Sequence, residues 1–228
     1  MKSRKNTCVI IQARLNSQRC PRKMVKPFAG TNLMQIAIDN MKNIKSLPLD
    51  NFYLSIYEPE LLEIANSNKI NYFKRSEKSA NSEGTPLTEI YEWWDQIPYE
   101  YVVMVNACAP LLTSETIDNF IESYLQSDSD GRFGVIEKKN YMWDKDGEFL
   151  TPLKEGIMNT KTADPVYEAA HCLYAGKMSN IGKGIWMGDF SKKGDIELVP
   201  MSEEECFDID YQWQFDLGEN LYRMKAEK

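Results

Sequence analysis

The chain has 228 residues, of which 43 % are hydrophobic and 27 % are charged, so it has the composition of a globular protein and not of a disordered one. No apolar run approaches the ~20 residues that a membrane helix needs, and the apolar run after the basic start of the chain is too short for a secretory signal. The five cysteines are scattered and include no C-x-x-C pair, which argues against a disulfide framework or a zinc site. We therefore expect a cytoplasmic protein with reduced thiols and no membrane partner.

The net charge of −7 is distributed unevenly. Residues 1–38 contain eight basic residues and no acidic one. A basic segment on an acidic body suggests a local anion site, whereas a nucleic-acid partner would require a broad basic face, and we expect none. A solvated basic tail is the alternative interpretation, but it accounts for Lys2 to Lys5 and not for Arg14 to Lys23, which directly follow a strand that we expect to be buried.

The predicted elements alternate between strands and helices along the first half of the chain. Short apolar runs predict strands at residues 7–13, 51–57, 69–73 and 101–105. Apolar residues at helical spacing predict helices at residues 32–44, from 59 onward, at 87–97 and at 113–125. Thr31 or Asn32 can cap the first helix, and the Ser/Thr pair at Thr113 can cap the last.

Repeated strand–helix units predict a mostly parallel, Rossmann-like α/β sheet covered by helices, in a single domain that spans residues 1–228. Sites in such sheets lie at the carboxyl ends of the strands, where loops lead into helices. The second half is less regular, and residues 141–167 contain glycines, prolines and mixed charge. We expect this segment to form an excursion or hairpin that faces a partner.

The loop after the first strand is the most informative stretch. It places Arg14, Ser17, Arg19 and Lys23 within ten residues. Backbone N–H groups and Ser17 could bind the oxygens of a triphosphate, while the cations could offset charge that builds on a leaving pyrophosphate. Pro21 fixes its own φ and stiffens the loop. The loop lacks the G-x-x-x-x-G-K-[ST] pattern and is therefore not a Walker A loop.

A second constellation lies near the end of the chain, where Asp208 and Asp210 precede a predicted helix. In an extended segment these two side chains share one face, and two close carboxylates repel each other unless a cation neutralises them. Mg²⁺ suits this arrangement when phosphate oxygens complete its shell. By spacing alone, the pair could equally be a helix cap or a solvated pair.

Together these motifs resemble the cytidylyltransferases, a family that includes the CMP-N-acylneuraminate and CMP-Kdo synthetases. The pattern R-x-x-S-x-R-x-P-x-K, followed by P-F-A-G and a helix, looks like their nucleotide-binding loop. Weaker similarities continue along the chain, at K-R-S-E (74–77), N-A-C-A-P-L (106–111), P-V-Y-E (165–168) running into C-L-Y (172–174), and D-I-D (208–210).

The resemblance implies a fold of the nucleotide-diphospho-sugar transferase type and a Mg²⁺-dependent transfer of CMP from CTP to an acidic sugar of the sialic-acid kind, with release of pyrophosphate. It also implies a homodimer with residues 141–167 at the interface, and a local hairpin over the sheet edge is the alternative. It assigns catalysis to Arg14, Arg19, Lys23 and Asp210, CTP binding to Ala13, Arg14, Asn16, Ser17, Lys23 and Arg75, acceptor binding to Asn106, His171 and Tyr174, and Mg²⁺ binding to Asp208 and Asp210.

The chain departs from the family pattern mainly on the acceptor side. Asn106 replaces a glutamine that faces the sugar, and Leu112 stands where an arginine is usual. The acceptor could therefore be Kdo or a phosphonate instead. The alternative to an enzyme is a non-catalytic relative that binds a nucleotide.

Several single residues allow more than one interpretation. His171, the only histidine, could be a general base or a polar group that closes a strand, and it occupies the position of a family asparagine. Cys108 has no evident base beside it, so we expect it to pack or to form a pocket wall. Tyr91, Trp93 and Trp94 are predicted to be core or interface aromatics.

Overall fold

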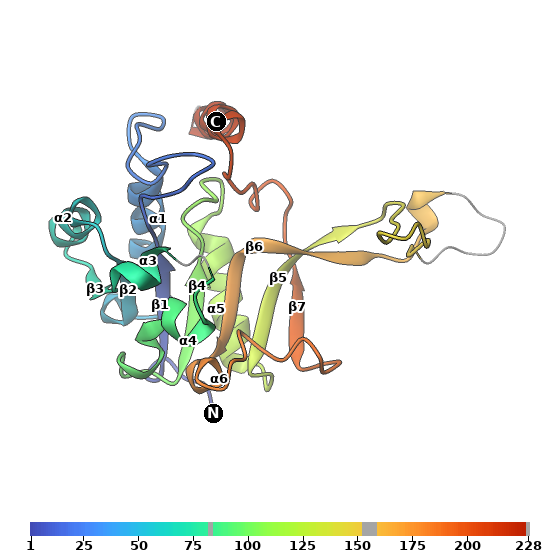
Figure 1. The fold of residues 1–228 in the computed structure, drawn as a ribbon, viewed down its shortest axis with the longest axis horizontal. Coiled ribbons are helices and arrows are strands. Elements are labelled where there is room, and N and C mark those ends of the chain that lie inside the picture. Colours follow the sequence, from blue (N-terminus) through green and yellow to red (C-terminus); the bar gives the residue numbers. More distant parts are fainter. Residues whose placement is uncertain (82–83, 152–158, 227–228) are drawn as a thin grey trace.

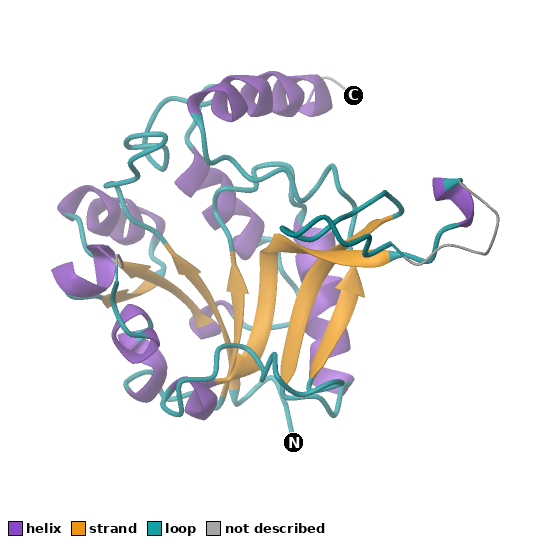
Figure 2. Ribbon diagram, turned by 45° about the vertical axis from the view of Figure 1, so that its right-hand side comes forward, coloured by secondary structure: helices purple, strands orange, loops and turns teal. Residues whose placement is uncertain are grey.

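A seven-stranded mixed sheet forms the centre of the protein in the computed structural model, which describes residues 1–81, 84–151 and 159–226 (Figures 1 and 2). The strands are β1 (Thr7–Gln12), β2 (Phe52–Ile56), β3 (Asn71–Lys74), β4 (Tyr101–Val105), β5 (Gly131–Lys138), β6 (Val166–Lys177) and β7 (Ile196–Pro200). Their spatial order is β3-β2-β1-β4-β6-β5-β7. All neighbours run parallel except β6, which is antiparallel to both β4 and β5. The prediction of a mostly parallel α/β sheet is confirmed.

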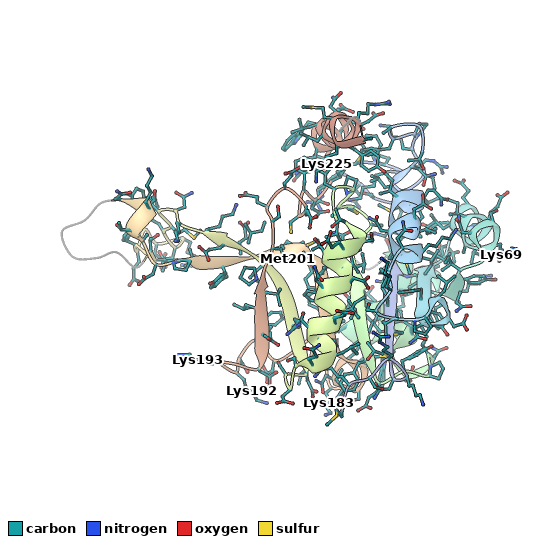
Figure 3. All side chains as sticks on the ribbon, turned by 180° about the vertical axis from the view of Figure 1, so that it is seen from behind. Lys69, Lys183, Lys192, Lys193, Met201 and Lys225 are labelled. Carbon is teal, nitrogen blue, oxygen red and sulfur yellow. The ribbon has the colours of Figure 1, made fainter. Side chains whose placement is uncertain are left out.

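Helices cover both faces of this sheet. They are α1 (Leu33–Lys42), α2 (Pro59–Asn68), α3 (Glu77–Asn81), α4 (Leu87–Ile90), α5 (Ser114–Gln126), α6 (Met178–Ile181) and α7 (Gln212–Ala226), with short 3-10 helices at Leu49–Asn51, Glu92–Asp95 and Thr160–Thr162. Helices α1, α2 and α5 pack on one face, and α6 and the segment around Trp93 pack on the other. Figure 3 shows α5 lying along its face of the sheet.

Strand β1 explains how a short apolar run produces a buried central strand. Val9 and Ile11 point into the core on the side of α1 and α5, whereas Cys8 and Ile10 point into the core on the other side. Because successive side chains alternate between the faces, a strand covered on both faces must be apolar throughout. The carboxyl end of β1 therefore emerges from the middle of the sheet, where the loop of residues 13–25 begins.

Two predictions about the elements need correction. The helix expected at 87–97 is broken, because α4 ends at Ile90 and a separate 3-10 helix follows at Glu92–Asp95. Trp93 is the reason for the break, since it turns into the core with no exposed surface and its indole N–H donates to Gln12 Oε1 over 3.0 Å. The second half is also more regular than expected, because it contributes β5, β6 and β7 to the same sheet.

The ends of β5 and β6 leave the body of the molecule and carry a projecting arm (Figure 1). Met201, whose N–H donates to Val135 O over 2.8 Å, lies where the arm begins (Figure 3). The excursion predicted at 141–167 overlaps β6 at residues 166 and 167, and its residues 152–158 lie outside the described part of the chain, so its full extent stays a prediction. No helix among the described residues is long and apolar enough to cross a membrane.

Candidate functional site

The loop after β1 is held by hydrogen bonds from both sides. The N–H of Leu15 donates to the Glu58 carboxylate over 2.7 Å, and the N–H of Arg22 donates back to Leu15 O. The Arg14 guanidinium donates to the carbonyl oxygens of Ala80 (3.1 Å) and Asn81 (2.7 Å), which ties the loop to α3. A loop fixed in this way can present its side chains without ordering them first.

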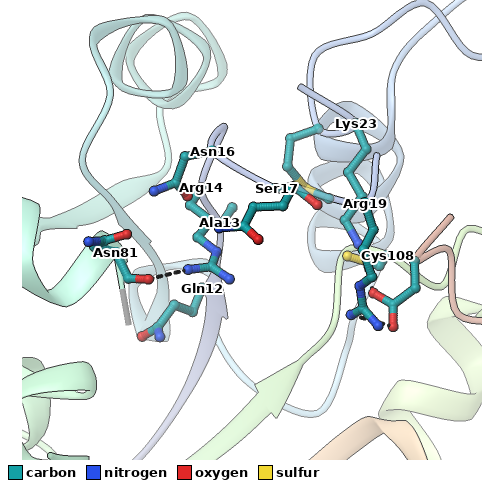
Figure 4. Close-up of a pocket in the computed structure, with 12 residues that line it drawn as sticks. Gln12, Ala13, Arg14, Asn16, Ser17, Arg19, Lys23, Asn81 and Cys108 are labelled. Carbon is teal, nitrogen blue, oxygen red and sulfur yellow. Dashed lines mark hydrogen bonds and ion pairs between the residues drawn. The ribbon is translucent and has the colours of Figure 1, made fainter. Parts of the chain in front are cut away.

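A cavity of about 390 Å³ lies over this loop (Figure 4). It is lined by Gln12, Ala13, Arg14, Asn16, Ser17, Gln18, Arg19, Lys23, Met24, Asn81, Cys108 and Asp210. Three cationic side chains and one carboxylate contribute to this wall, so the cavity suits an anion with several oxygens. We call it the loop cavity.

The segment before α7 brings the two aspartates to the same region. Ile209 is fully buried and its N–H donates to Cys108 O over 2.9 Å, while Asp208 and Asp210 on either side of it face the same opening. This alternation confirms the prediction that the two carboxylates share one face. Asp210 pairs with Arg19 over 2.8 Å and with Lys23 over 3.4 Å, so the end of the chain contacts the loop after β1.

A second cavity, of about 380 Å³, adjoins the first. It is lined by Gln12, Tyr91, Met104, Val105, Asn106, His171, Tyr174, Trp186, Asp208 and Asp210. Gln12 and Asp210 line both cavities. A molecule in the loop cavity and a second molecule in this one, which we call the aromatic cavity, would meet at Asp210.

The charges at the junction shift the pKa values of their neighbours. Burial, followed by the negative charge of Asp210, raises the pKa of Asp208 above its ordinary value. Burial alone would lower the pKa of Lys23, but Cys108 and the two aspartates outweigh it, and the net shift is upward. Lys23 is therefore a buried lysine that keeps its charge.

Cys108 is part of the wall of the loop cavity, as we expected for a residue without a base. Burial raises the pKa of its thiol to about 11, so the thiolate that nucleophilic catalysis requires is scarce at neutral pH. Its contribution is contact and shape.

Arg75 does not line the loop cavity, unlike the other residues that were predicted to bind CTP. It contributes to a smaller hollow with Gln12, Ala13 and Arg14, and its guanidinium donates to the hydroxyl and the carbonyl of Ser79. Burial and the charge of Arg14 lower the pKa of Arg75 to about 10. Its observed contacts hold α3 in place.

Sequence reasoning missed several residues that line the cavities. Tyr91 was predicted to be a core or interface aromatic, but it lines the aromatic cavity and stacks on Trp186 with ring centroids 6.0 Å apart. Gln12, which lines both cavities, is the last residue of β1 and belongs to no motif. Its position at the carboxyl end of β1 was the one available signal, since sites in such sheets gather there.

The donor set at the junction fits a divalent cation that is shared with a ligand. Among the described residues no three histidine, cysteine, aspartate or glutamate side chains form a metal-binding group, so the protein would offer the carboxylates of Asp208 and Asp210 at most. Mg²⁺ takes one or two carboxylates and leaves its other positions to water and phosphate oxygens. Burial is the main cause of the raised pKa of Asp208 and the charge of Asp210 is the second, and a bound cation would offset both.

Comparisons with known proteins identify the family of the chain. Two pseudaminic acid cytidylyltransferases from strains of Campylobacter jejuni are each 25 % identical to the chain over 98 % of both sequences. The fold is similar to that of a CMP:2-keto-3-deoxy-manno-octonic acid synthetase complexed with CTP, with a TM-score of 0.69 and 8 % identity over 96 % of this chain and 99 % of that one. It is also similar to a cytidylyltransferase from Leptospira borgpetersenii, with a TM-score of 0.63 and 14 % identity over 96 % and 87 % of the two chains. The cytidylyltransferase family model matches residues 8–175, well over half of the sequence, and the chain therefore belongs to the cytidylyltransferase family.

Proposed function

We propose that this protein transfers CMP from CTP to an acidic sugar and releases pyrophosphate, with a nonulosonic acid of the sialic or pseudaminic kind as the acceptor. The observation that carries the proposal is the pair of adjoining cavities, one rich in cations and the other polar and aromatic, which share Gln12 and Asp210. Two substrates whose reacting atoms must meet require such an arrangement. The name of the Campylobacter relatives supports the choice of acceptor class.

In the proposed reaction the acceptor hydroxyl attacks the α-phosphorus of CTP in line with the departing pyrophosphate. Arg19 and Lys23 would bind the phosphates and offset the charge that develops on the leaving group. Both cations contact Asp210 in the structure, so the phosphates of CTP would compete with that carboxylate for them. Arg14, Asn16, Ser17 and the backbone at Ala13 would complete the phosphate site, and Arg75 would support it through α3.

Asp208 and Asp210 would hold Mg²⁺, which, when bound, supplies positive charge between the protein and the phosphates. Side chains of the protein would align the second substrate, the acceptor sugar. Asn106, His171 and Tyr174 line the aromatic cavity and would contact the acceptor sugar. The Asn106 amide already donates to Asp208 over 3.2 Å, which orients one proposed metal ligand.

Pyrophosphate release from CTP in the presence of a panel of acceptors tests the proposed function. The panel contains nine-carbon 2-keto acids, Kdo and a phosphonate, and each reaction is also run with GTP, UTP and ATP. We expect release with CTP and a nine-carbon acid. Release only with Kdo or the phosphonate would change the acceptor, whereas CTP binding without release from any acceptor would identify a non-catalytic relative.

We also propose that the whole chain is one domain and that the protein works in the cytoplasm. We further propose that it forms a homodimer through the arm of residues 141–167. The support for the dimer is a group of aromatic side chains on the arm. Trp143 packs against Phe149 with ring centroids 5.3 Å apart, yet the two remain 57 % and 39 % exposed. Exposed apolar side chains gathered on a projecting segment favour burial by a partner.

A further inference from the structure

We propose that His171 determines acceptor specificity by donating a hydrogen bond from Nε2–H to the carboxylate of the acidic sugar, and that it does not act as a general base. This inference rests on the proposed function and assigns one residue to one group of the acceptor. It follows from the backbone at His171, from its hydrogen bond to Tyr174 and from the charges that line the aromatic cavity.

The backbone of His171 has an unusual conformation for a strand residue. Its φ is +55°, in the left-handed region that L residues seldom adopt, although it lies within β6. The residue that follows β4 holds this conformation, because the Asn106 side chain donates to His171 O over 2.8 Å and the Asn106 N–H donates to Cys172 O over 2.9 Å. Such outliers persist where the surroundings impose them and cluster at functional sites. Here the result is a histidine in the wall of a cavity.

The hydrogen bond to Tyr174 determines which ring nitrogen of His171 carries a hydrogen. Nδ1 lies 2.7 Å from the Tyr174 hydroxyl oxygen. Burial raises the pKa of Tyr174, which is only 8 % exposed, so its hydroxyl keeps its proton. Nδ1 is the one acceptor that this buried hydroxyl has among the described residues, and a buried O–H without an acceptor is costly, so the hydroxyl donates to Nδ1 of the neutral ring. The neutral ring then carries its hydrogen on Nε2, and the protonated ring carries hydrogens on both nitrogens. In either state Nε2 is a donor, whereas a general base would need it bare.

Nε2 is available for a ligand. Within the described part of the chain it has no hydrogen-bond partner, while Nδ1 is occupied by Tyr174. His171 itself is exposed. A fixed, unpaired donor in the wall of a cavity is suited to a substrate oxygen.

The charges of the aromatic cavity explain why an acidic acceptor needs this donor. The described residues that line it include Asp208 and Asp210 but no lysine or arginine. The amide N–H groups of Asn106 are engaged by His171 O and Asp208, and Gln12 accepts from Trp93. The amide N–H groups of Gln12 and the buried indole N–H of Trp186 have no hydrogen-bond partner among the described residues either, but neither side chain can become a cation. Among the described residues of this wall, His171 is the one side chain that can combine an N–H donor with a positive charge.

The test compares an acidic sugar that the wild type uses with its methyl ester. The ester keeps the shape and the attacking hydroxyl but lacks the charge. We expect the wild type to prefer the acid, with a ratio of kcat/KM above 10. His171→Phe should raise the KM for the acid by roughly 10- to 100-fold, the scale of one hydrogen bond to a charged group, and bring the ratio close to 1. The KM for CTP and the kcat should change less than about threefold.

Two further variants separate the donor from the fold. His171→Asn tolerates the left-handed backbone, but its amide ends near the position of Nδ1, so it should melt like the wild type and still lose the preference for the acid. His171→Gln places an amide N–H near the position of Nε2 and should recover most of that preference. Tyr174→Phe removes the hydroxyl that sets the tautomer and should weaken the preference partly.

The opposite results would overturn the assignment. A variant His171→Asn or His171→Phe that folds and keeps the acid-to-ester ratio would show that the carboxylate is bound elsewhere. A collapse of kcat with an unchanged acceptor KM, not recovered by His171→Gln, would identify a general base. If the wild type itself released no pyrophosphate with any acidic sugar, the proposed function would fail first and this assignment with it.

Discussion

Lys23 and Asp210 lie 187 residues apart in the sequence, yet the Lys23 Nζ is 3.4 Å from the Asp210 carboxylate and also donates to the carbonyl of Ile209. Lys23 is only 7 % exposed, and Cys108, Asp208 and Asp210 together keep its pKa above the ordinary value despite this burial. The contact joins the loop after β1 to the segment before α7. It means that the two ends of the chain form one site, and each of the first three predictions depends on it.

Replacing Lys23 with alanine should lower kcat roughly 100- to 1,000-fold, which corresponds to ~2.7–4 kcal/mol for the loss of one preorganised stabilising group. Pyrophosphate release at saturating CTP measures this effect. Lys26→Ala is the matched control, because Lys26 directly follows the same loop but donates to Gln212 and does not line the loop cavity. Melting curves must show that Lys23→Ala is folded, since it leaves the Ile209 carbonyl without a donor. Near-normal turnover in a folded Lys23→Ala would contradict the proposed role.

Asp208→Asn and Asp210→Asn should lose most activity and the binding of Mg²⁺ in the presence of CTP. Two carboxylates alone make a weak Mg²⁺ site, so calorimetry on the wild type should detect little binding without CTP and clear binding with it. The two variants should differ in stability. Asp208→Asn removes a carboxylate that burial and Asp210 disfavour, and it should melt at or above the wild-type temperature. Asp210→Asn leaves Lys23 without a strong partner and should melt lower. Activity that survives excess chelator would exclude the metal.

Gly218→Ala should impair the site more than the fold. A Cβ at Gly218 would lie 3.0 Å from Ile209 Cδ1 and 3.2 Å from the ring of Phe207, so these two side chains would have to give by a few tenths of an ångström. Both side chains belong to the segment that carries the two aspartates, and we expect the shift to be passed on to the carboxylates. Alanine also favours the helix by ~0.5–1 kcal/mol, which offsets the crowding in the free energy of unfolding. We expect the affinity for Mg²⁺ in the presence of CTP to fall roughly several-fold. The free energy of unfolding should change by less than about 1 kcal/mol. Asn220→Ala, on the same helix, should leave the affinity unchanged. Unaltered affinity in Gly218→Ala would mean that the segment tolerates the shift.

Trp143→Ser combined with Leu150→Ser should produce monomers if the arm forms the dimer interface. Both side chains are more than half exposed, at 57 % and 53 %, so their removal should cost the isolated fold little. Light scattering at micromolar concentration distinguishes a monomer of 26.4 kDa from a dimer. Leu49→Ser, an exposed apolar residue outside the arm, provides the control. A wild type that is monomeric in this measurement would refute the interface altogether.

Asp118 provides a prediction about pH and stability that is independent of the site. Its carboxylate accepts from the N–H of Lys45 over 2.9 Å and of Ser46 over 2.8 Å, which joins α5 to the turn after α1. Burial acts to raise the pKa of Asp118, but the hydrogen bonds from Ser46 and Lys45 outweigh it and place the pKa below the ordinary 3.8. Asp118→Ala should therefore cost about 1–3 kcal/mol at neutral pH. A depressed folded-state pKa gives stability that is present above the unfolded value and is lost as pH falls through the folded value. The difference between wild type and Asp118→Ala in urea unfolding should shrink below pH ~3.8, and a difference that stays constant would exclude the charge as its source.

The sequence by itself determined the architecture of the first half and the identity of the two charged motifs. Apolar runs such as Cys8 to Ile11 can only be strands covered on both faces, and the capping pattern at Asn32 and Thr113 placed two helices correctly, because these signals are local. Asp208 and Asp210 share a face for the same reason, since the alternation of an extended chain needs no partner. The sequence also predicted a local anion site, because the basic loop follows a buried strand directly.

Only the tertiary structure decided how these pieces meet. Local spacing does not encode the contact of Lys23 with Asp210, the place of Gln12 between two cavities or the hydrogen bond between His171 and Tyr174. The antiparallel strand β6 was not predicted, because its bulged and partly exposed sequence shows no regular alternation of apolar and polar residues. Its pairing with β4 and β5 depends on residues that are distant in the sequence. Trp93 broke a predicted helix because burial against the sheet outweighed helical propensity. Local patterns specify elements, whereas the sheet order brings distant side chains to one edge, and the chemistry of the site depends on that order.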